Sequence, residues 1–123
     1  MVYSGVEKRK SPRVRMGRVE ISTTEGAPGP FMTCEPENVS VGGLCVRLDR
    51  ELKLFTGVHL RLFIDNETPP IECKGKINWT MALASEHPFP PYVYETGIEF
   101  VHLNERHRKL IMKKVDSILN RIE

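Results

Sequence analysis

The sequence predicts a mainly β protein, an antiparallel barrel or sandwich of six short strands with one α-helix at the C-terminus. Two observations carry this prediction. Apolar and polar residues alternate in six short segments bounded by residues typical of turns, which indicates half-buried strands. Apolar residues recur at helical spacing only within residues 104–123. Strands without intervening helices favour an antiparallel sheet over an α/β fold.

The strands can be placed in order along the chain. In the first strand, the alternation of apolar and polar residues slips at Gly17, which indicates a bulge there. The second and third flank a polar turn, and the last contains Gly97, which indicates a bend or a close approach by another group. The six predicted strands cover residues 14–23, 31–35, 44–48, 58–64, 71–79 and 93–101, and residues 84–91 are predicted to form a proline-rich loop.

The C-terminal helix is predicted over residues 104–123. Asn104 is a suitable N-cap, and Glu105 lies in the first turn, where the helix dipole favours a negative charge. One face of the helix is apolar and the other is charged, so the helix lies either on the barrel or on a second subunit. The apolar face consists of Ile111, Val115, Ile118, Leu119 and Ile122.

The composition is that of one ordinary globular domain. The chain has 123 residues, 40% hydrophobic and 28% charged, and its net charge of +2 disfavours a DNA-packaging role. No apolar run is long enough to cross a membrane, and the first residues do not resemble a secretion signal. Cys34, Cys45 and Cys73 are odd in number and far apart, which suits a reducing compartment, so a cytoplasmic protein is expected.

Signatures of catalysis and metal binding are missing from the sequence. The histidines have no metal-ligand spacing with a cysteine, and neither a CxxC pair nor a GxxxxGK[ST] phosphate loop occurs. The pair Gly42-Gly43 precedes a strand, so no helix N-terminus is available there to bind phosphate. We therefore expect no enzyme activity and no cofactor or metal. The four histidines are His59, His87, His102 and His107.

Two polar segments remain as candidates for binding. Residues 1–13 are predicted to form a flexible basic arm, because Pro12 excludes a continuous helix or a central strand. The turn at residues 38–43 combines two short polar side chains with two glycines, which is more than a hairpin requires. Taken singly, the arm is interpreted as a solvated tail and the turn as an ordinary loop.

Together, the two segments resemble the PilZ domain family. Arg9 and Arg13 have the spacing of its RxxxR signature, and Asn38, Ser40 and Gly43 that of its [D/N]xSxxG signature. The segments Ile77-Asn78-Trp79 and Gly97-Ile98-Glu99-Phe100 also resemble the later pattern of the family. The resemblance covers nearly the whole chain. It implies a six-stranded antiparallel barrel with a C-terminal helix, formed by residues 14–123 as a single domain behind the arm.

The resemblance also implies a ligand, bis-(3′-5′)-cyclic dimeric GMP (c-di-GMP), which is a bacterial second messenger. Because the family often has arginine where Lys8 or Lys10 stands here, the number of ligand molecules bound at the site stays open. The family's ligand-binding positions fall on Arg9, Arg13, Asn38, Ser40 and Gly43, and they extend to Lys8, Lys10 and Trp79.

The chemistry of these residues suits such a ligand. A guanidinium group matches phosphate oxygens and also the O6 and N7 edge of guanine. Asn38 offers a carboxamide oxygen to guanine N–H donors, and Ser40 offers a hydroxyl group. Structural roles stay open beside these: Asn38 and Ser40 as turn caps, Trp79 as a barrel-edge residue and Lys10 as a solvated neighbour.

The sequence thus predicts a receptor that works without catalysis. Ligand binding orders the arm against the turn, and an unidentified downstream protein recognises the changed surface. Two alternatives stay open: a PilZ-like adaptor that binds protein without nucleotide, and a nucleic-acid-binding β-barrel. The near-neutral net charge disfavours nucleic acid. No membrane association is expected, and the protein is predicted to be a monomer or a homodimer.

Overall fold

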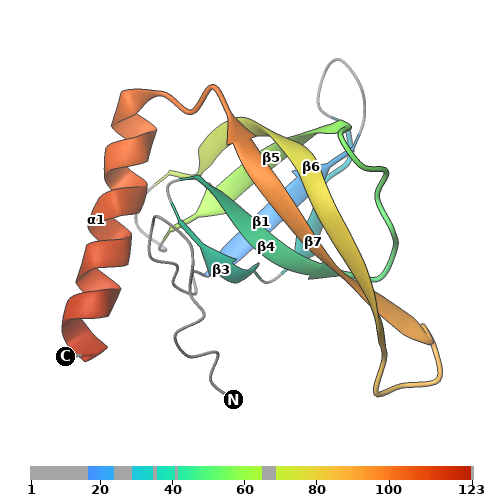
Figure 1. Ribbon diagram of the computed structural model, residues 1–123. Coiled ribbons are helices and arrows are strands. Elements are labelled where there is room, and N and C mark those ends of the chain that lie inside the picture. Colours follow the sequence, from blue (N-terminus) through green and yellow to red (C-terminus); the bar gives the residue numbers. More distant parts are fainter. Residues whose placement is uncertain (1–16, 24–28, 35, 41, 65–68, 123) are drawn as a thin grey trace.

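The computed structural model describes residues 17–23, 29–34, 36–40, 42–64 and 69–122 of the chain. This described part contains seven strands and one helix (Figure 1). The helix is capped as predicted, because Asn104 Oδ1 accepts the His107 N–H at 2.8 Å. The elements are β1 (Arg18–Ser22), β2 (Met32–Cys34), β3 (Pro36–Val39), β4 (Gly43–Leu48), β5 (Gly57–Phe63), β6 (Ile71–Ala84), β7 (Tyr92–Val101) and α1 (Glu105–Ile122).

The seven strands form one antiparallel sheet in the order β2-β1-β5-β6-β7-β4-β3. β2 and β3 are the two edges of this sheet, although residue 35 alone separates them in the chain. The last residue of β2 and the first residue of β3 are two positions apart, so their Cα atoms lie at most about 7 Å from each other. The two edges must therefore meet, and the sheet must curl. β2 also contacts β4. The predicted antiparallel barrel is therefore confirmed as a curled sheet, with α1 along one side (Figure 1).

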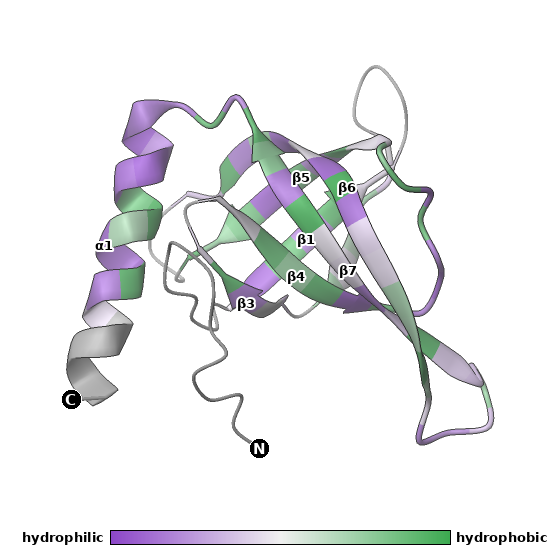
Figure 2. Cartoon of the chain, viewed as in Figure 1, coloured by the Kyte–Doolittle hydropathy of each residue, from purple (hydrophilic) through white to green (hydrophobic). Residues whose placement is uncertain are grey.

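The core lies inside the curl and extends to the helix. Alternate residues of β1, β4, β5 and β6 point inward, and Figure 2 shows the corresponding alternation of hydropathy along the strands. Ile111 and Val115 of α1 belong to the same buried cluster, so this part of the apolar helix face lies on the barrel. The side chains of residues 118–122 are outside the described part. Among the described helices, none is long and apolar enough to cross a membrane.

The structure corrects two details of the predicted strands. Pro36–Val39 forms an additional strand, β3, which lacks apolar alternation but buries Val39 and pairs with β4. The strand predicted over residues 71–79 is longer, because β6 continues to Ala84, and the loop predicted over residues 84–91 is found at residues 85–91, before β7 begins at Tyr92. The register between β1 and β5 is continuous from Arg18 to Ser22, and the bulge predicted at Gly17 depends on residues 14–16, which lie outside the described part. Register shifts occur in β3 and β6.

Candidate ligand-binding site

The turn between β3 and β4 is held by its own serine. The Ser40 N–H donates to the Gly43 carbonyl oxygen at 2.9 Å, and the Gly42 N–H donates to Ser40 Oγ at 3.2 Å. The Ser40 hydroxyl also lies 3.5 Å from the Gly43 carbonyl oxygen. Ser40 is only 3% exposed. Its hydroxyl therefore stabilises the turn, which is the capping role that the sequence left open.

Gly43 is required by the neighbouring strand. The Phe100 N–H donates to the Gly42 carbonyl oxygen at 3.0 Å, which holds the tip of the β3–β4 hairpin against β7. A Cβ atom at Gly43 would overlap the Ile98 carbonyl oxygen and would lie 3.2 Å from the Glu99 Cα atom. Both atoms belong to the backbone and cannot rotate away. The close backbone approach that this glycine permits is therefore that of β7.

The strand register places four residues in one row across β3, β4, β7 and β6. They are Asn38, Cys45, Gly97 and Trp79, each directly paired with the next. Residues paired in this way point to the same face of the sheet. Ile98 beside Gly97 is buried in the core, so the row lies on the outer face. With strands about 4.8 Å apart, the row spans about 14 Å.

Trp79 reaches the outer face because of the bulge in β6. Strict alternation would send Trp79 to the same side as Ile77, which is buried in the core. The register shift between Ile77 and Trp79 reverses this phase. The indole then lies directly over Gly97, where a Cβ atom would overlap its nitrogen, and the side chain remains 41% exposed. The close approach predicted at Gly97 is thus confirmed, and the approaching group is the indole.

This geometry agrees with a comparison of the whole sequence with known families. The profile of the PilZ domain matches residues 7–117. The chain belongs to the PilZ domain family. The match includes the predicted arm residues, the β3–β4 hairpin and the strands that form the outer row. A comparison with curated protein sequences found no significant match.

Solved structures share the fold at low sequence identity. The PilZ domain of YcgR from Escherichia coli with c-di-GMP has a TM-score of 0.69 at 8% identity, covering 94% of this chain and 95% of that chain. The Klebsiella pneumoniae MrkH–c-di-GMP complex has a TM-score of 0.72 at 13% identity, covering 95% of this chain and 55% of MrkH. The Bacillus subtilis inhibitor of motility, MotI, has a TM-score of 0.69 at 16% identity, with 95% and 54% covered. The chain thus spans about half the length of MrkH and MotI.

Charged residues flank the row of this PilZ domain, and they are paired with each other. Arg47 Nη2 lies 3.1 Å from Glu95 Oε2 on one side of the row. Lys76 Nζ lies 4.0 Å from Glu99 Oε1 on the other side. The four residues of the row itself carry no charge. The two cations that flank the row, Arg47 and Lys76, therefore each already have a carboxylate partner.

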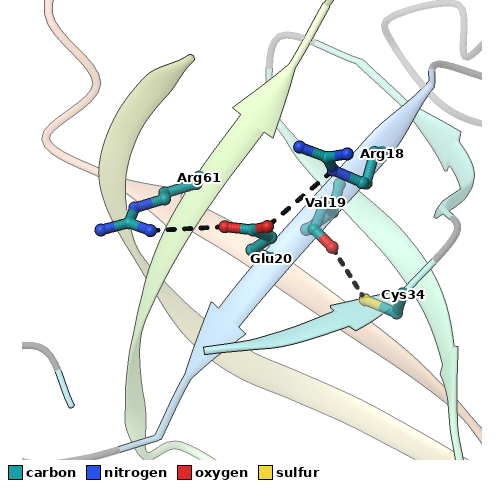
Figure 3. Close-up of polar contacts among 5 residues, drawn as sticks. All are labelled: Arg18, Val19, Glu20, Cys34 and Arg61. Carbon is teal, nitrogen blue, oxygen red and sulfur yellow. Dashed lines mark hydrogen bonds and ion pairs between the residues drawn. The ribbon is translucent and has the colours of Figure 1, made fainter. Parts of the chain in front are cut away.

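A second polar cluster lies on β1 and β5. Figure 3 shows Glu20 between two arginines, 3.9 Å from Arg18 and 3.4 Å from Arg61. The Arg18 guanidinium lies 4.0 Å from the centre of the Phe63 ring, and the Arg61 guanidinium lies 3.9 Å from that of Phe31. Both arginines are thus stacked on aromatic rings as well as ion-paired. This cluster stabilises the outer face of two adjacent strands.

The thiols of Cys34 and Cys73 are poor nucleophiles in this environment. Burial raises the pKa of Cys34 to about 11 and that of Cys73 to about 12. Cys34 Sγ also lies 3.6 Å from the Val19 carbonyl oxygen, to which it donates (Figure 3). Both thiols therefore stay protonated at neutral pH. Within the described ranges, no three His, Cys, Asp or Glu side chains converge in a group that could hold a metal ion.

The structure brings together the predicted site residues that it describes. Asn38, Ser40 and Gly43 belong to one hairpin, and Trp79 shares the outer row with Asn38. The sequence did not indicate that Cys45 joins this row, because alternation fixes its outward direction but not its neighbours. The four arm residues lie outside the described part, so their contact with the hairpin stays a prediction. These residues are Lys8, Arg9, Lys10 and Arg13.

Proposed function

We propose that this PilZ domain is a bacterial cytoplasmic receptor for c-di-GMP, without catalytic activity, that relays ligand binding to a partner protein. The observation that carries the proposal is the outer row. It joins the asparagine of the [D/N]xSxxG signature to an exposed indole on one uncharged surface. A dinucleotide needs both a polar edge for its bases and an aromatic face for stacking.

The two ends of the row suit different parts of the ligand. The Trp79 indole is held on Gly97 and keeps part of its surface open, so a guanine base can stack beside or on it. Asn38 provides a carboxamide that can accept guanine N–H groups. The two ends lie about 14 Å apart, with Cys45 of β4 and Gly97 of β7 between them. Ser40 and Gly43 act indirectly in this proposal, by shaping the hairpin that presents Asn38.

The two phosphodiester charges require cations that the row does not provide. Arg47 and Lys76 already face Glu95 and Glu99. Arg9 and Arg13 are therefore the proposed phosphate and guanine ligands, with Lys8 and Lys10 beside them. Closing this arm over the row would change the surface around the β3–β4 hairpin, and that change is the proposed signal to the partner protein.

The test is isothermal titration calorimetry of the whole chain with c-di-GMP. The wild type is expected to bind, and Arg13→Ala leaves a ligand charge unpaired, which costs roughly 2–5 kcal/mol or about 30-fold or more in affinity. The matched control is Arg106→Ala, which removes an exposed arginine from the first turn of α1. The control is expected to bind like the wild type.

Three other results would each contradict the proposal or part of it. Wild-type affinity in Arg13→Ala would show that the arm does not contribute to the site. A folded wild-type chain without any c-di-GMP binding would favour the adaptor that binds protein without nucleotide. Tight binding of single-stranded DNA with a steep salt dependence would favour a nucleic-acid-binding barrel, because a ligand with two charges releases few counterions.

A further inference from the structure

The outer part of β6 has an open edge. β5 pairs with β6 only as far as Lys76, and backbone bonds of Phe55 and Thr56 to Ile77, at 2.7 and 3.0 Å, end the pairing on this side. Among the described residues, residues 78–84 pair with β7 alone. Figure 1 shows this part of the β6–β7 hairpin projecting beyond the barrel. It leaves the far side of β6 accessible to another strand.

The direction of the free peptide groups follows from one hydrogen bond. The Ser85 N–H donates to the Pro91 carbonyl oxygen at 2.8 Å, so the backbone groups of Ser85 point toward β7. Peptide groups alternate in direction along a strand, and the register of this stretch is continuous after Trp79. The N–H and C=O groups of Thr80, Ala82 and Ala84 therefore point away from β7, toward the open edge.

This edge lacks the features that normally prevent strand pairing. Proteins protect exposed edges with charged side chains, prolines, bulges or very short strands. Residues 78–84 read Asn-Trp-Thr-Met-Ala-Leu-Ala and contain neither a charge nor a proline. The bulge lies at the start of this segment, between Ile77 and Trp79, and the register is continuous after it. In Figure 2 the end of β6 toward the hairpin tip is pale to green.

Exposed apolar side chains gather around the same edge. Seven large apolar side chains are exposed among the described residues, and six of them belong to the β6–β7 hairpin or to the loop that bonds to Ile77. The seventh is Met112 on α1. Such a concentration is typical of an interaction surface. The six are Leu54, Phe55, Trp79, Met81, Phe89 and Tyr92.

We propose that the open edge of β6 pairs with the same edge of a second copy of this chain, antiparallel about a two-fold axis at Ala82. The outward-pointing residues fix this register. Ala82 then lies opposite Ala82 of the second copy, and Thr80 lies opposite Ala84. Every free N–H and C=O group of these three residues finds a partner. In any other antiparallel register that pairs outward-pointing residues with each other, at least one of the three residues in each copy has no outward-pointing partner in this segment.

The side chains are self-complementary in this register. Met81 lies opposite Leu83 of the second copy, which makes two equivalent apolar cross-strand pairs. Small residues at Ala82 and Ala84 place no bulk at the axis, and no like charges face each other. The hairpin tip of the second copy, which carries Phe89, continues toward Leu54 and Phe55. This places the most exposed apolar side chain against the exposed loop beside Ile77.

The first test is the oligomeric state of the whole chain without nucleotide, measured by analytical ultracentrifugation over a range of concentrations. The wild type is expected to form a reversible dimer. Met81→Lys is expected to raise the dimer Kd at least about tenfold, because it places a charge against Leu83 of the second copy. Met112→Lys is the matched control, since Met81 is 52% and Met112 is 48% exposed. A wild type that stays monomeric up to about 1 mM, or equal effects of both variants, would overturn the proposal.

A second test measures the register by disulfide cross-linking. Ala82→Cys is expected to form an intermolecular disulfide on mild oxidation, because paired Cα atoms at the axis lie about 5.5 Å apart. Ala84→Cys is expected not to cross-link, since each introduced thiol would lie opposite Thr80 of the other copy. The background reaction is slow because burial raises the pKa values of Cys34 and Cys73 to about 11 and 12, and because Cys45 is only 5% exposed. Equal cross-linking of both variants, or none by Ala82→Cys, contradicts the proposed axis. This outcome is independent of c-di-GMP binding.

Discussion

Gly97→Ala tests whether the Trp79 indole lies on the outer row. A Cβ atom at residue 97 would overlap the indole nitrogen and would lie 2.6 Å from Trp79 Cδ1. The colliding group is a side chain, so the indole can rotate off the sheet. A buried tryptophan covers up to about 250 Å², and more than half of the Trp79 side chain is covered. Exposing about 75 Å² of it costs about 2 kcal/mol at about 25 cal/mol/Å².

Part of this loss is offset by the strand itself. Alanine is about 0.5–1 kcal/mol more favourable than glycine in a strand interior. The net loss of stability is therefore about 1–1.5 kcal/mol, which corresponds to a fall in Tm of roughly 3–6 °C for a domain of this size. Because the row loses its stacking surface, c-di-GMP affinity should fall in the same variant.

The assay is intrinsic fluorescence, because Trp79 is the single tryptophan of the chain. In Gly97→Ala the emission maximum is expected to move to longer wavelength, and urea unfolding followed by the same signal gives the stability change. Gly57→Ala is the matched control, since its Cβ atom would meet only the Gly75 carbonyl oxygen at an ordinary 3.8 Å. Unchanged emission and stability in Gly97→Ala would show that the indole does not rest on residue 97.

Two further predictions concern the hairpin and the thiols. Ser40→Ala is expected to lower the free energy of unfolding in urea by about 1 kcal/mol, because the Gly42 N–H loses its acceptor. Unchanged stability would assign Ser40 to the ligand alone. Burial raises the pKa of Cys34 from 9.0 to about 11 and that of Cys73 from 9.0 to about 12. The contribution of the two protonated thiols to the free energy of unfolding is therefore fully present below about pH 9. It is expected to fall as the pH rises from about 9 to 11–12, and a Cys34→Ala, Cys73→Ala variant should show a flatter pH profile in urea unfolding.

Most of the fold follows from local patterns in the sequence. Val58, Leu60 and Leu62 alternate with polar residues, and the structure buries all three in β5. β3 could not be predicted in this way, because its pairing with β4 depends on the turn between Ser40 and Gly43 rather than on an apolar pattern. A proline disfavours a strand inside a sheet, but Pro36 is tolerated because β3 lies at the sheet edge.

The sequence indicated residues for the candidate site but not how they are arranged. Asn38 and Trp79 are far apart in the chain, and the sequence offers no register that joins them. That register depends on two intermediate strands, through Cys45 and Gly97. Gly97 did carry a signal, because a glycine inside a strand indicates a close approach. The identity of the approaching group, the Trp79 indole, required the three-dimensional pairing of β6 with β7.

The bulge in β6 determines how the two halves of this strand are used. Before the bulge, Ile71 and Ile77 point into the core and β5 covers the other side, so the strand is part of the barrel wall. After it, the phase reverses and Trp79 lies on the outer row. The same position is where β5 pairing ends and the free edge begins. One inserted residue therefore creates both surfaces, because strict alternation, which holds up to Ile77, would direct Trp79 to the core face.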